Sequence, residues 1–243
     1  FRRVLFRSSV VISNGIWKDD NELFLIAQRE LYTAVVGDIM DQMGLFHQFL
    51  PPQVQPLEKN MFVVGRAMTV MEADVIEDRL QQGVNPVLKQ SFGLMLDALD
   101  DLKRNEVYIC SGASPSYALW GELMSARAKK LGANGAVVNG YSRDTKGIVA
   151  MNFPTFSFGS YAQDQAPRGK VVDFRVPIKL GEVVIVSGDI VIGDIDGVCI
   201  VPANAVEEVF RLAIEKARGE KLVYNKIMGG MSAREAFYTY GIL

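Results

Sequence analysis

The chain has 243 residues, 49% of them hydrophobic and 22% charged, which is the composition of an ordinary globular protein. The net charge of −2 argues against nucleic acid as a partner, because neutralising phosphates requires a basic surface. No apolar stretch approaches the roughly 20 residues that span a bilayer, so we expect a cytoplasmic protein with no membrane contact.

The chain has one histidine and two cysteines. The single histidine, His47, excludes any metal centre built on two or more imidazoles, and a Ser-His-Asp triad would have to use it. Metal chemistry must therefore rest on carboxylates and water, which suits Mg²⁺ or Mn²⁺. Cys110 and Cys199 lie in apolar runs and indicate core residues in a reducing compartment.

The N-terminal third begins with nine residues, FRRVLFRSS, that lack the pattern of a signal peptide. We expect these to be a non-native or disordered leader, and residues 10–243 to form one domain. Helical spacing of apolar residues predicts a helix over 19–43, closed by Gly44. A turn-rich segment, PPQVQP, then leads to a valine-rich strand over 62–71.

Helical and strand patterns alternate in the middle of the chain. The predicted segments are a helix over 86–102, a strand over 107–110, a Ser/Gly loop over 111–116, a helix over 119–131 and a strand over 136–139. Gly132 is a typical helix end, and Asn134-Gly135 is a typical turn.

The last third is predicted to be rich in strands before a final helix. A short strand is expected over 155–158 and a β-rich segment over 171–201, in which Asp196-Gly197 indicates a hairpin. A clean apolar stripe predicts a helix over 204–218, with Asn204 and Glu207 resembling a capping box. One mixed α/β domain is the simplest interpretation.

The segment from Gly121 to Asp144 has an informative geometry. A helix of about 12 residues descends roughly 18 Å, and a strand of four or five residues climbs back about 15 Å. The start of the helix and the end of the strand therefore lie at the same end of this unit. Glu122 is thus predicted to face Arg143 and Asp144.

This convergence has a chemical meaning. The free amides of the first helical turn, from Gly121 through Leu123 to Met124, favour an anion. Arg143 offers a planar fork for a carboxylate, and Asp144 with Glu122 offers oxygen ligands for a hard metal. Each feature alone has a plainer interpretation: a solvated Arg-Asp pair, or an acid that complements a helix dipole.

These residues also resemble the RraA-like family, which includes the 4-hydroxy-4-methyl-2-oxoglutarate aldolases, or class II pyruvate aldolases. The family signature is an acidic residue, twenty intervening residues and then Arg-Asp, as in Glu122, residues 123–142 and Arg143-Asp144. The segments GDIMDQMG, VGRAMTV, ALWGELM, FPTFSFG and SGDIVIGDIDGVCIVP are also similar to family segments. One departure is Gly147, where the family often has an acidic residue.

The resemblance implies a layered β/β/α fold of the swivelling-domain type, with a mixed sheet and flanking helices. It also implies a homo-oligomer, trimer or hexamer, and an Mg²⁺ or Mn²⁺ cofactor. By the resemblance, Arg143 binds the substrate carboxylate, Asp144 the metal and Glu122 a metal-bound water. The backbone from Gly121 to Met124 would hold the pyruvyl end of a 2-oxo acid.

The implied reaction is the cleavage of a 4-hydroxy-2-oxo acid to pyruvate and a second 2-oxo acid, with oxaloacetate decarboxylation as a related activity. A second hypothesis is a non-catalytic regulator that binds ribonuclease E, since the family includes such members. Methyl transfer is disfavoured, because GANG at 132–135 follows a helix and precedes a strand, the reverse of a nucleotide-binding loop.

Overall fold

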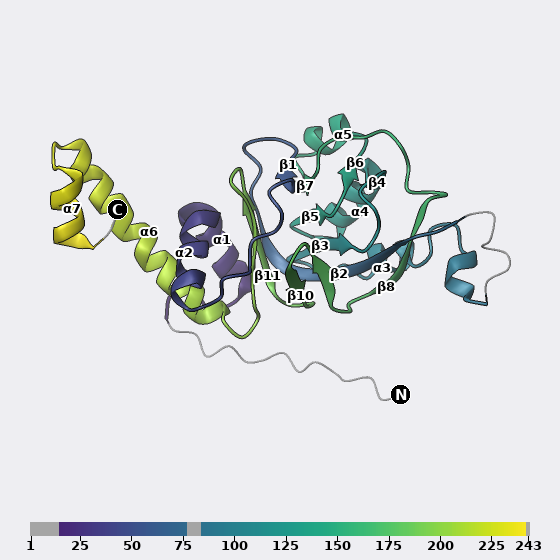
Figure 1. Ribbon diagram of the computed structural model, residues 1–243, viewed down its shortest axis with the longest axis horizontal. Coiled ribbons are helices and arrows are strands. Elements are labelled where there is room, and N and C mark those ends of the chain that lie inside the picture. The colour runs from purple at the N-terminus through teal and green to yellow at the C-terminus, as the bar shows by residue number, and fades with distance from the viewer. Residues whose placement is uncertain (1–14, 77–83, 242–243) are drawn as a thin grey trace.

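A mixed eight-stranded sheet forms the centre of the computed structural model, which describes residues 15–76 and 84–241 (Figure 1). The predicted leader, residues 1–9, lies outside the described residues. The strands of this sheet are β1 (Gln55–Pro56), β2 (Val63–Asp74), β3 (Glu106–Ser111), β5 (Gly135–Val138), β7 (Thr155–Ser157), β8 (Gly169–Phe174), β11 (Ile190–Asp194) and β12 (Gly197–Val201).

Four neighbouring strands of the sheet, β2, β3, β5 and β7, run parallel. Their carboxyl ends therefore meet at one edge, where ligands of open α/β sheets usually bind. β2 pairs antiparallel with β11 through its first half and with β8 through its second half. The predicted hairpin is confirmed, because β11 and β12 pair up to Asp194 and Gly197.

The sheet is covered on both faces, so the expected β/β/α layering is confirmed. One face carries α3 (Met95–Asp100), α4 (Glu122–Leu131), α5 (Thr145–Ala150) and a small sheet of β4 (Ala118–Trp120) with β6 (Tyr141–Ser142). The other face carries the hairpin β9 (Ile178–Leu180) and β10 (Val183–Ile185). On the helical face, the rings of Tyr108, Trp120 and Phe153 pack in a row.

Helices at the two chain ends pack beside the β11–β12 end of the sheet: α1 (Asp20–Glu30), α2 (Thr33–Gln42) and α6 (Val206–Met228). The prediction of one helix over 19–43 is wrong, because the chain is extended at Leu31 and Tyr32. The new helix begins where the Thr33 amide and hydroxyl donate to the Asp194 carboxylate. A partner from a distant strand thus stabilises the break.

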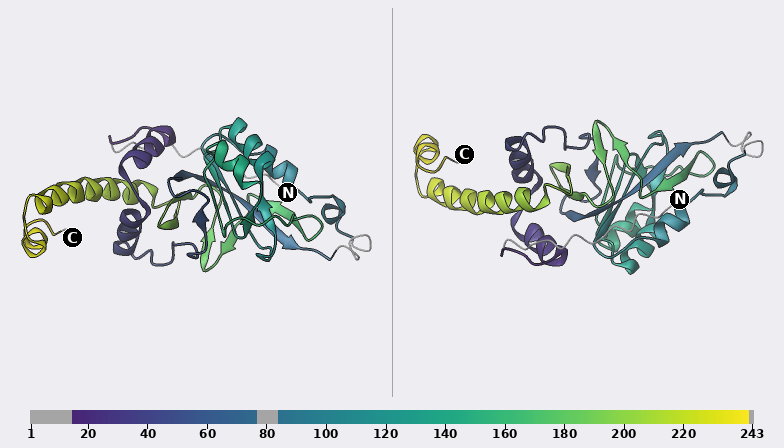
Figure 2. Two further views of the ribbon diagram at one scale, coloured as in Figure 1. Left: turned by 90° about the horizontal axis from the view of Figure 1, so that it is seen from above. Right: turned by 90° about the horizontal axis from the view of Figure 1, so that it is seen from below.

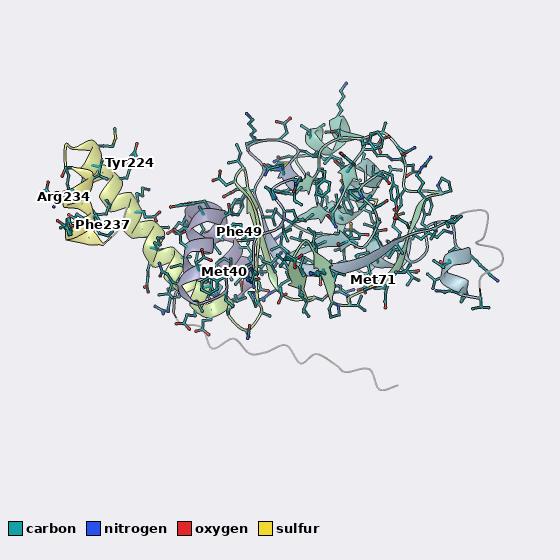
Figure 3. The ribbon with its side chains drawn as sticks, in the orientation of Figure 1. Met40, Phe49, Met71, Tyr224, Arg234 and Phe237 are labelled. Carbon is teal, nitrogen blue, oxygen red and sulfur yellow. The ribbon has the colours of Figure 1, made fainter. Side chains whose placement is uncertain are left out.

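The last helices form an arm that leaves the body of the molecule (Figures 1 and 2). α6 continues ten residues past the predicted end and carries α7 (Ala233–Tyr240) at its tip. The predicted capping box is wrong, because α6 starts after Ala205 without a side-chain cap within the described chain. Tyr224 and Phe237 lie on the arm with largely exposed side chains (Figure 3).

Two other predicted helices are shorter than expected. The segment predicted as a helix over 86–102 contains a 3-10 turn, Pro86–Lys89, and then α3. The helix predicted from residue 119 begins instead at Glu122, because the residues before it form β4. Gly132 ends α4 in a left-handed conformation, as predicted. Among residues 15–76 and 84–241, no helix is both long and apolar enough to cross a membrane.

Candidate active site

The small sheet β4–β6 brings the start of α4 next to the residues that follow β6. Trp120 is in register with Ser142, and the Arg143 amide donates to the Trp120 carbonyl at 2.9 Å. Gly121 then caps α4, while Asp144 precedes α5. The helix start and the strand end therefore meet at the carboxyl edge of the parallel strands.

Gly121 lies directly against the Arg143-Asp144 pair. A methyl group at position 121 would lie 3.0 Å from Asp144 Oδ2 and 3.6 Å from Arg143 Cγ. Both side chains thus approach the backbone at the beginning of α4. Gly121 provides no side-chain cap, and within the described residues no side-chain cap is found at this helix start. The first amides of α4 remain available to an anion.

Glu122 is held close to the first turn of α5. A methyl group at Gly147 would overlap the Glu122 carboxyl group, so only glycine leaves this carboxyl its observed place. Since Asp144 directly precedes α5 and Gly147 lies in its first turn, the Glu122 and Asp144 carboxyl groups border the same turn. The Glu122 carboxyl group thus fills the space that a side chain at position 147 would take.

Asp144 has an unusual backbone, and within the described chain its side chain does not cap the helix that follows it. Its φ of 56° is left-handed, a conformation that non-glycine residues adopt at a cost and that is common at functional sites. Aspartate at a helix start usually caps the helix, but here its side chain makes no capping bond to the described residues of α5. The carboxylate instead lies beside Gly121, with Oδ2 3.7 Å from Arg143 Nε.

Arg143 is paired with a second acid that the sequence did not indicate. Its Nη1 lies 3.4 Å from Asp164 Oδ1, and the side chains of Arg143 and Asp164 are 38% and 41% exposed. Asp164 arrives on a segment that bridges to Ala118 of β4. No pattern around Asp164 marks it as a site residue. Water screens these exposed pairs, so they orient the guanidinium more than they stabilise the fold.

The predicted substrate contacts at Leu123 and Met124 involve only their backbone. Leu123 is 84% exposed and Met124 is half-buried, and both follow Gly121 in the first turn of α4. Their amides belong to the first turn of α4, which begins beside Arg143 at Gly121. His47 is exposed in the connection after α2, and it is not part of this cluster.

The carboxyl groups of Asp144 and Glu122 could bind a divalent ion such as Mg²⁺ only if the ion keeps several of its water ligands. Within residues 15–76 and 84–241, no three His, Cys, Asp or Glu side chains gather as a complete ligand set. Mg²⁺ commonly keeps several waters and takes one or two carboxylates together with oxygens of the substrate. The uncapped Asp144 carboxylate and the Glu122 carboxyl in its glycine cradle provide this number of groups.

The Ser/Gly loop and the turn at 132–135 lie outside this cluster and have other roles. In the Ser/Gly loop, the Ser114 amide and hydroxyl donate to Asp74 Oδ1 at 3.0 and 3.1 Å, and Tyr117 donates to the same atom. Burial acts to raise the pKa of Asp74, but these hydrogen bonds hold it below its usual value. The loop therefore binds a carboxylate of its own chain. Gly132 and Gly135 connect α4 to β5, which is the wrong order for a nucleotide-binding loop.

Comparison with known proteins shows a relationship to the RraA-like family. A family described as RraA-like, Aldolase/RraA, matches residues 33–200. A protein of Halalkalibacterium halodurans named "Putative 4-hydroxy-4-methyl-2-oxoglutarate aldolase" is 31% identical over 216 residues, which cover 88% of this chain and 93% of that protein.

Two solved structures have the same fold. An uncharacterized protein from Pseudomonas syringae pv. tomato is 22% identical with a TM-score of 0.76, covering 96% of this chain and all of its own. RraAS2 of Streptomyces coelicolor, described as an unusual member of the RNase ES inhibitor RraA protein family, is 22% identical with a TM-score of 0.70, covering 85% of this chain and 98% of its own. The chain belongs to the RraA-like family.

Proposed function

We propose that the protein is a divalent-metal-dependent lyase that cleaves 4-hydroxy-2-oxo acids of the 4-hydroxy-4-methyl-2-oxoglutarate type. The products are pyruvate and a second 2-oxo acid, and oxaloacetate decarboxylation is a related activity. The observation that carries this proposal is the convergence of Glu122, Arg143 and Asp144 at the uncapped start of α4. The relationship to a protein named as an aldolase supports it.

Substrate binding would use the positive groups of the site. The Arg143 guanidinium binds the C1 carboxylate, and the pairs with Asp144 and Asp164 hold Arg143 in place. The amides of Glu122 to Met124 bind the pyruvyl oxygens, where the helix dipole favours negative charge. Asp144 and Glu122 would hold Mg²⁺ or Mn²⁺, Asp144 directly and Glu122 through water. When bound, the ion stabilises negative charge on the C2 oxygen.

Proton transfer would fall to Glu122. Its carboxylate, directly or through one water, accepts the proton of the 4-hydroxyl group. The C4–O bond becomes a carbonyl, the C3–C4 bond breaks, and its electron pair remains on C3 as the enolate of pyruvate. A proton returned to C3 completes the product. Oxaloacetate decarboxylation passes through the same enolate, with carbon dioxide as the leaving group.

A pyruvate-release assay over 4-hydroxy-2-oxo acids and oxaloacetate tests this proposal. We expect EDTA to abolish release and Mg²⁺ or Mn²⁺ to restore it, and we expect borohydride to trap no substrate adduct. Asp144→Ala should lower kcat/KM by about 10³-fold, the scale for losing a group that stabilises developing charge. Asp97→Ala, an exposed acid on α3, is the matched control and should change little. Near-normal turnover in Asp144→Ala would refute the assignment.

A regulator that binds ribonuclease E is the second candidate, because RraAS2 shares this fold and its description names RNase ES inhibition. A pull-down with ribonuclease E beside the pyruvate assay separates the two functions. Binding without metal-dependent turnover would favour the regulator.

We also propose a homo-oligomer, trimer or hexamer, located in the cytoplasm. The arm supports assembly, because it exposes several large apolar side chains that a partner would bury: Leu222, Tyr224, Met228, Phe237 and Tyr238. The two cysteines, Cys110 and Cys199, are buried free thiols, in accord with a reducing compartment.

A further inference from the structure

A buried carboxyl group lies beneath the site end of the sheet. Glu72 is only 2% exposed and sits near the end of β2, next to Met71, which is labelled in Figure 3. It follows Met68 and Val70 at alternate positions of β2, on the face that carries the helical layer, so the carboxyl group lies at the end of an apolar pair. An acid so deeply buried requires a partner.

That partner is the side chain of Gln165. Its Nε2 donates to Glu72 Oε2, across 93 residues of sequence, and Gln165 is itself 4% exposed. The second oxygen, Glu72 Oε1, has no hydrogen-bond partner among the described residues. Burial raises the pKa of Glu72 to about 8, against the effect of hydrogen bonds from Gln165 and Cys110. Glu72 therefore holds its proton to a higher pH than an exposed glutamate does.

Gln165 belongs to the segment that reaches the candidate site. The residue before it, Asp164, bridges to Ala118 and carries the carboxylate 3.4 Å from Arg143 Nη1. The Gln163 carbonyl accepts the Ala118 amide at 2.8 Å. Gln165 thus points into the core, while its neighbour Asp164 faces the site. The hydrogen bond between Gln165 and Glu72 therefore holds the segment that carries the Asp164 carboxylate.

Among the described residues, Asp164 is one of the two acids that contact the Arg143 side chain. The ion pairs of Arg143 with described residues use Nε towards Asp144 and Nη1 towards Asp164, and Nη2 is in neither pair. With Asp164 in place, the guanidinium can present Nη2 to a substrate carboxylate. With Asp164 displaced, the long side chain regains rotamers that do not face the site.

We infer that Glu72 is a positioning residue: its buried carboxyl group anchors Gln165, and through Asp164 it holds Arg143 in the orientation that binds a carboxylate. The role of Arg143 as a carboxylate-binding group rests on the proposed function. The anchoring of residues 159–168 by Glu72 does not.

The test compares three variants with the wild-type protein. Glu72→Ala removes the anchor. Glu72→Gln keeps an acceptor for the Gln165 amide. Val70→Ala removes a buried side chain from the same face of the same strand without touching the anchor, and so serves as the structural control. If Glu72→Ala does not fold, Gln165→Leu removes the other partner of the bond.

Two readouts are needed, hydrogen exchange of residues 159–168 and the KM and kcat for the 4-hydroxy-2-oxo acid. We expect Glu72→Ala to accelerate exchange in this segment and to raise KM by about tenfold, the scale of one lost hydrogen bond to a charged group, with a smaller change in kcat. Glu72→Gln should restore both readouts. Val70→Ala should lower stability and leave both readouts unchanged.

Unchanged exchange in Glu72→Ala, or the same acceleration in Val70→Ala, overturns the inference. An unchanged KM beside accelerated exchange overturns the step from Asp164 to Arg143. If the wild-type protein releases no pyruvate, the proposed function fails, and the exchange measurement still decides whether Glu72 anchors the segment.

Discussion

The two ends of the parallel strands differ in how their polar side chains are engaged. At the amino ends, a cavity of about 290 Å³ lies between α1 and the sheet, and polar side chains line it together with apolar ones. Two of its amides are committed to the protein. Asn105 donates to Asn21 Oδ1 at 2.8 Å, and Asn134 donates to the Val64 carbonyl at 2.8 Å.

At the carboxyl ends, the charged groups are turned outwards instead. The Asp144 carboxylate leaves its own helix uncapped, and Glu122 rests in a gap that only Gly147 provides. Arg143 keeps only loose pairs at 3.4 and 3.7 Å. The cavity at the amino ends therefore offers fewer free polar groups than line it, while the carboxyl ends offer charged groups that are only loosely paired. The better indication of a binding site is a group of charged side chains that lie together without strong hydrogen bonds or ion pairs inside the protein.

The largest expected effect concerns Glu72, beneath the site end. Its pKa of about 8 in the folded protein lies above its ordinary value of 4.5, so the folded state holds the proton more tightly between these values. Stability should therefore fall as pH rises from about 5 to 8, by at most roughly 1.4 kcal/mol per pH unit from this group. Glu72→Gln should flatten that slope in urea unfolding curves. A slope equal to the wild type's would contradict the burial of an acid here.

Arg143 gives the next largest effect. Arg143→Lys keeps the charge but loses the planar fork, so KM for the 2-oxo acid should rise roughly 10- to 100-fold, the equivalent of a charged hydrogen bond. Steady-state kinetics measure it. Arg127→Lys, on α4 and paired with Asp100 at 2.7 Å, is the control and should behave as wild type. Equal KM values in Arg143→Lys and Arg127→Lys would show that Arg143 does not bind the substrate.

The convergence of the candidate residues could be predicted from the sequence because their main contacts are local. Glu122, Arg143 and Asp144 belong to one helix–turn–strand unit, whose geometry follows from element lengths. Asp164 could not be predicted, because only a tertiary bridge brings it to Ala118. The position of Glu72 did not mark it either, because Arg66 and Asp74 are charged residues at the same alternate positions of β2.

The layered fold was likewise predictable, while several element boundaries were not. The break between α1 and α2 depends on Asp194, a distant residue. α6 continues past residue 218, the predicted end, where Arg218 pairs with Glu30 of α1 at 2.7 Å. Both boundaries depend on contacts that no local pattern records.

Gly147 should separate activity from stability. Alanine at this helical position would push the Glu122 carboxyl aside, so we expect kcat/KM to fall about tenfold, at the low end for a displaced acid–base group. Stability should hold or rise by up to about 1 kcal/mol, because alanine favours a helix over glycine. Gly219→Ala, also inside a helix but on the arm, should raise stability without the loss of activity. Full activity in Gly147→Ala would contradict the role of Glu122 in proton transfer.

The smallest effect is expected at the opposite end of the strands. Asn134→Ala removes the bond to the Val64 carbonyl and should cost about 1 kcal/mol of unfolding free energy, with kcat and KM unchanged. Thermal unfolding and the pyruvate assay measure the two quantities. A large loss of activity in Asn134→Ala would instead indicate that the functional site lies at the 290 Å³ cavity, at the amino ends of the strands.

The most direct test of the candidate site at Glu122, Arg143 and Asp144 is the binding of Mn²⁺. Electron paramagnetic resonance of the free ion measures it for the wild type and Asp144→Asn, with and without pyruvate. We expect the wild type to bind about one ion per chain and pyruvate to tighten this binding. Asp144→Asn should lose both the binding and its response to pyruvate. Equal Mn²⁺ binding by the two proteins, or binding that pyruvate leaves unchanged, would contradict the proposed metal site.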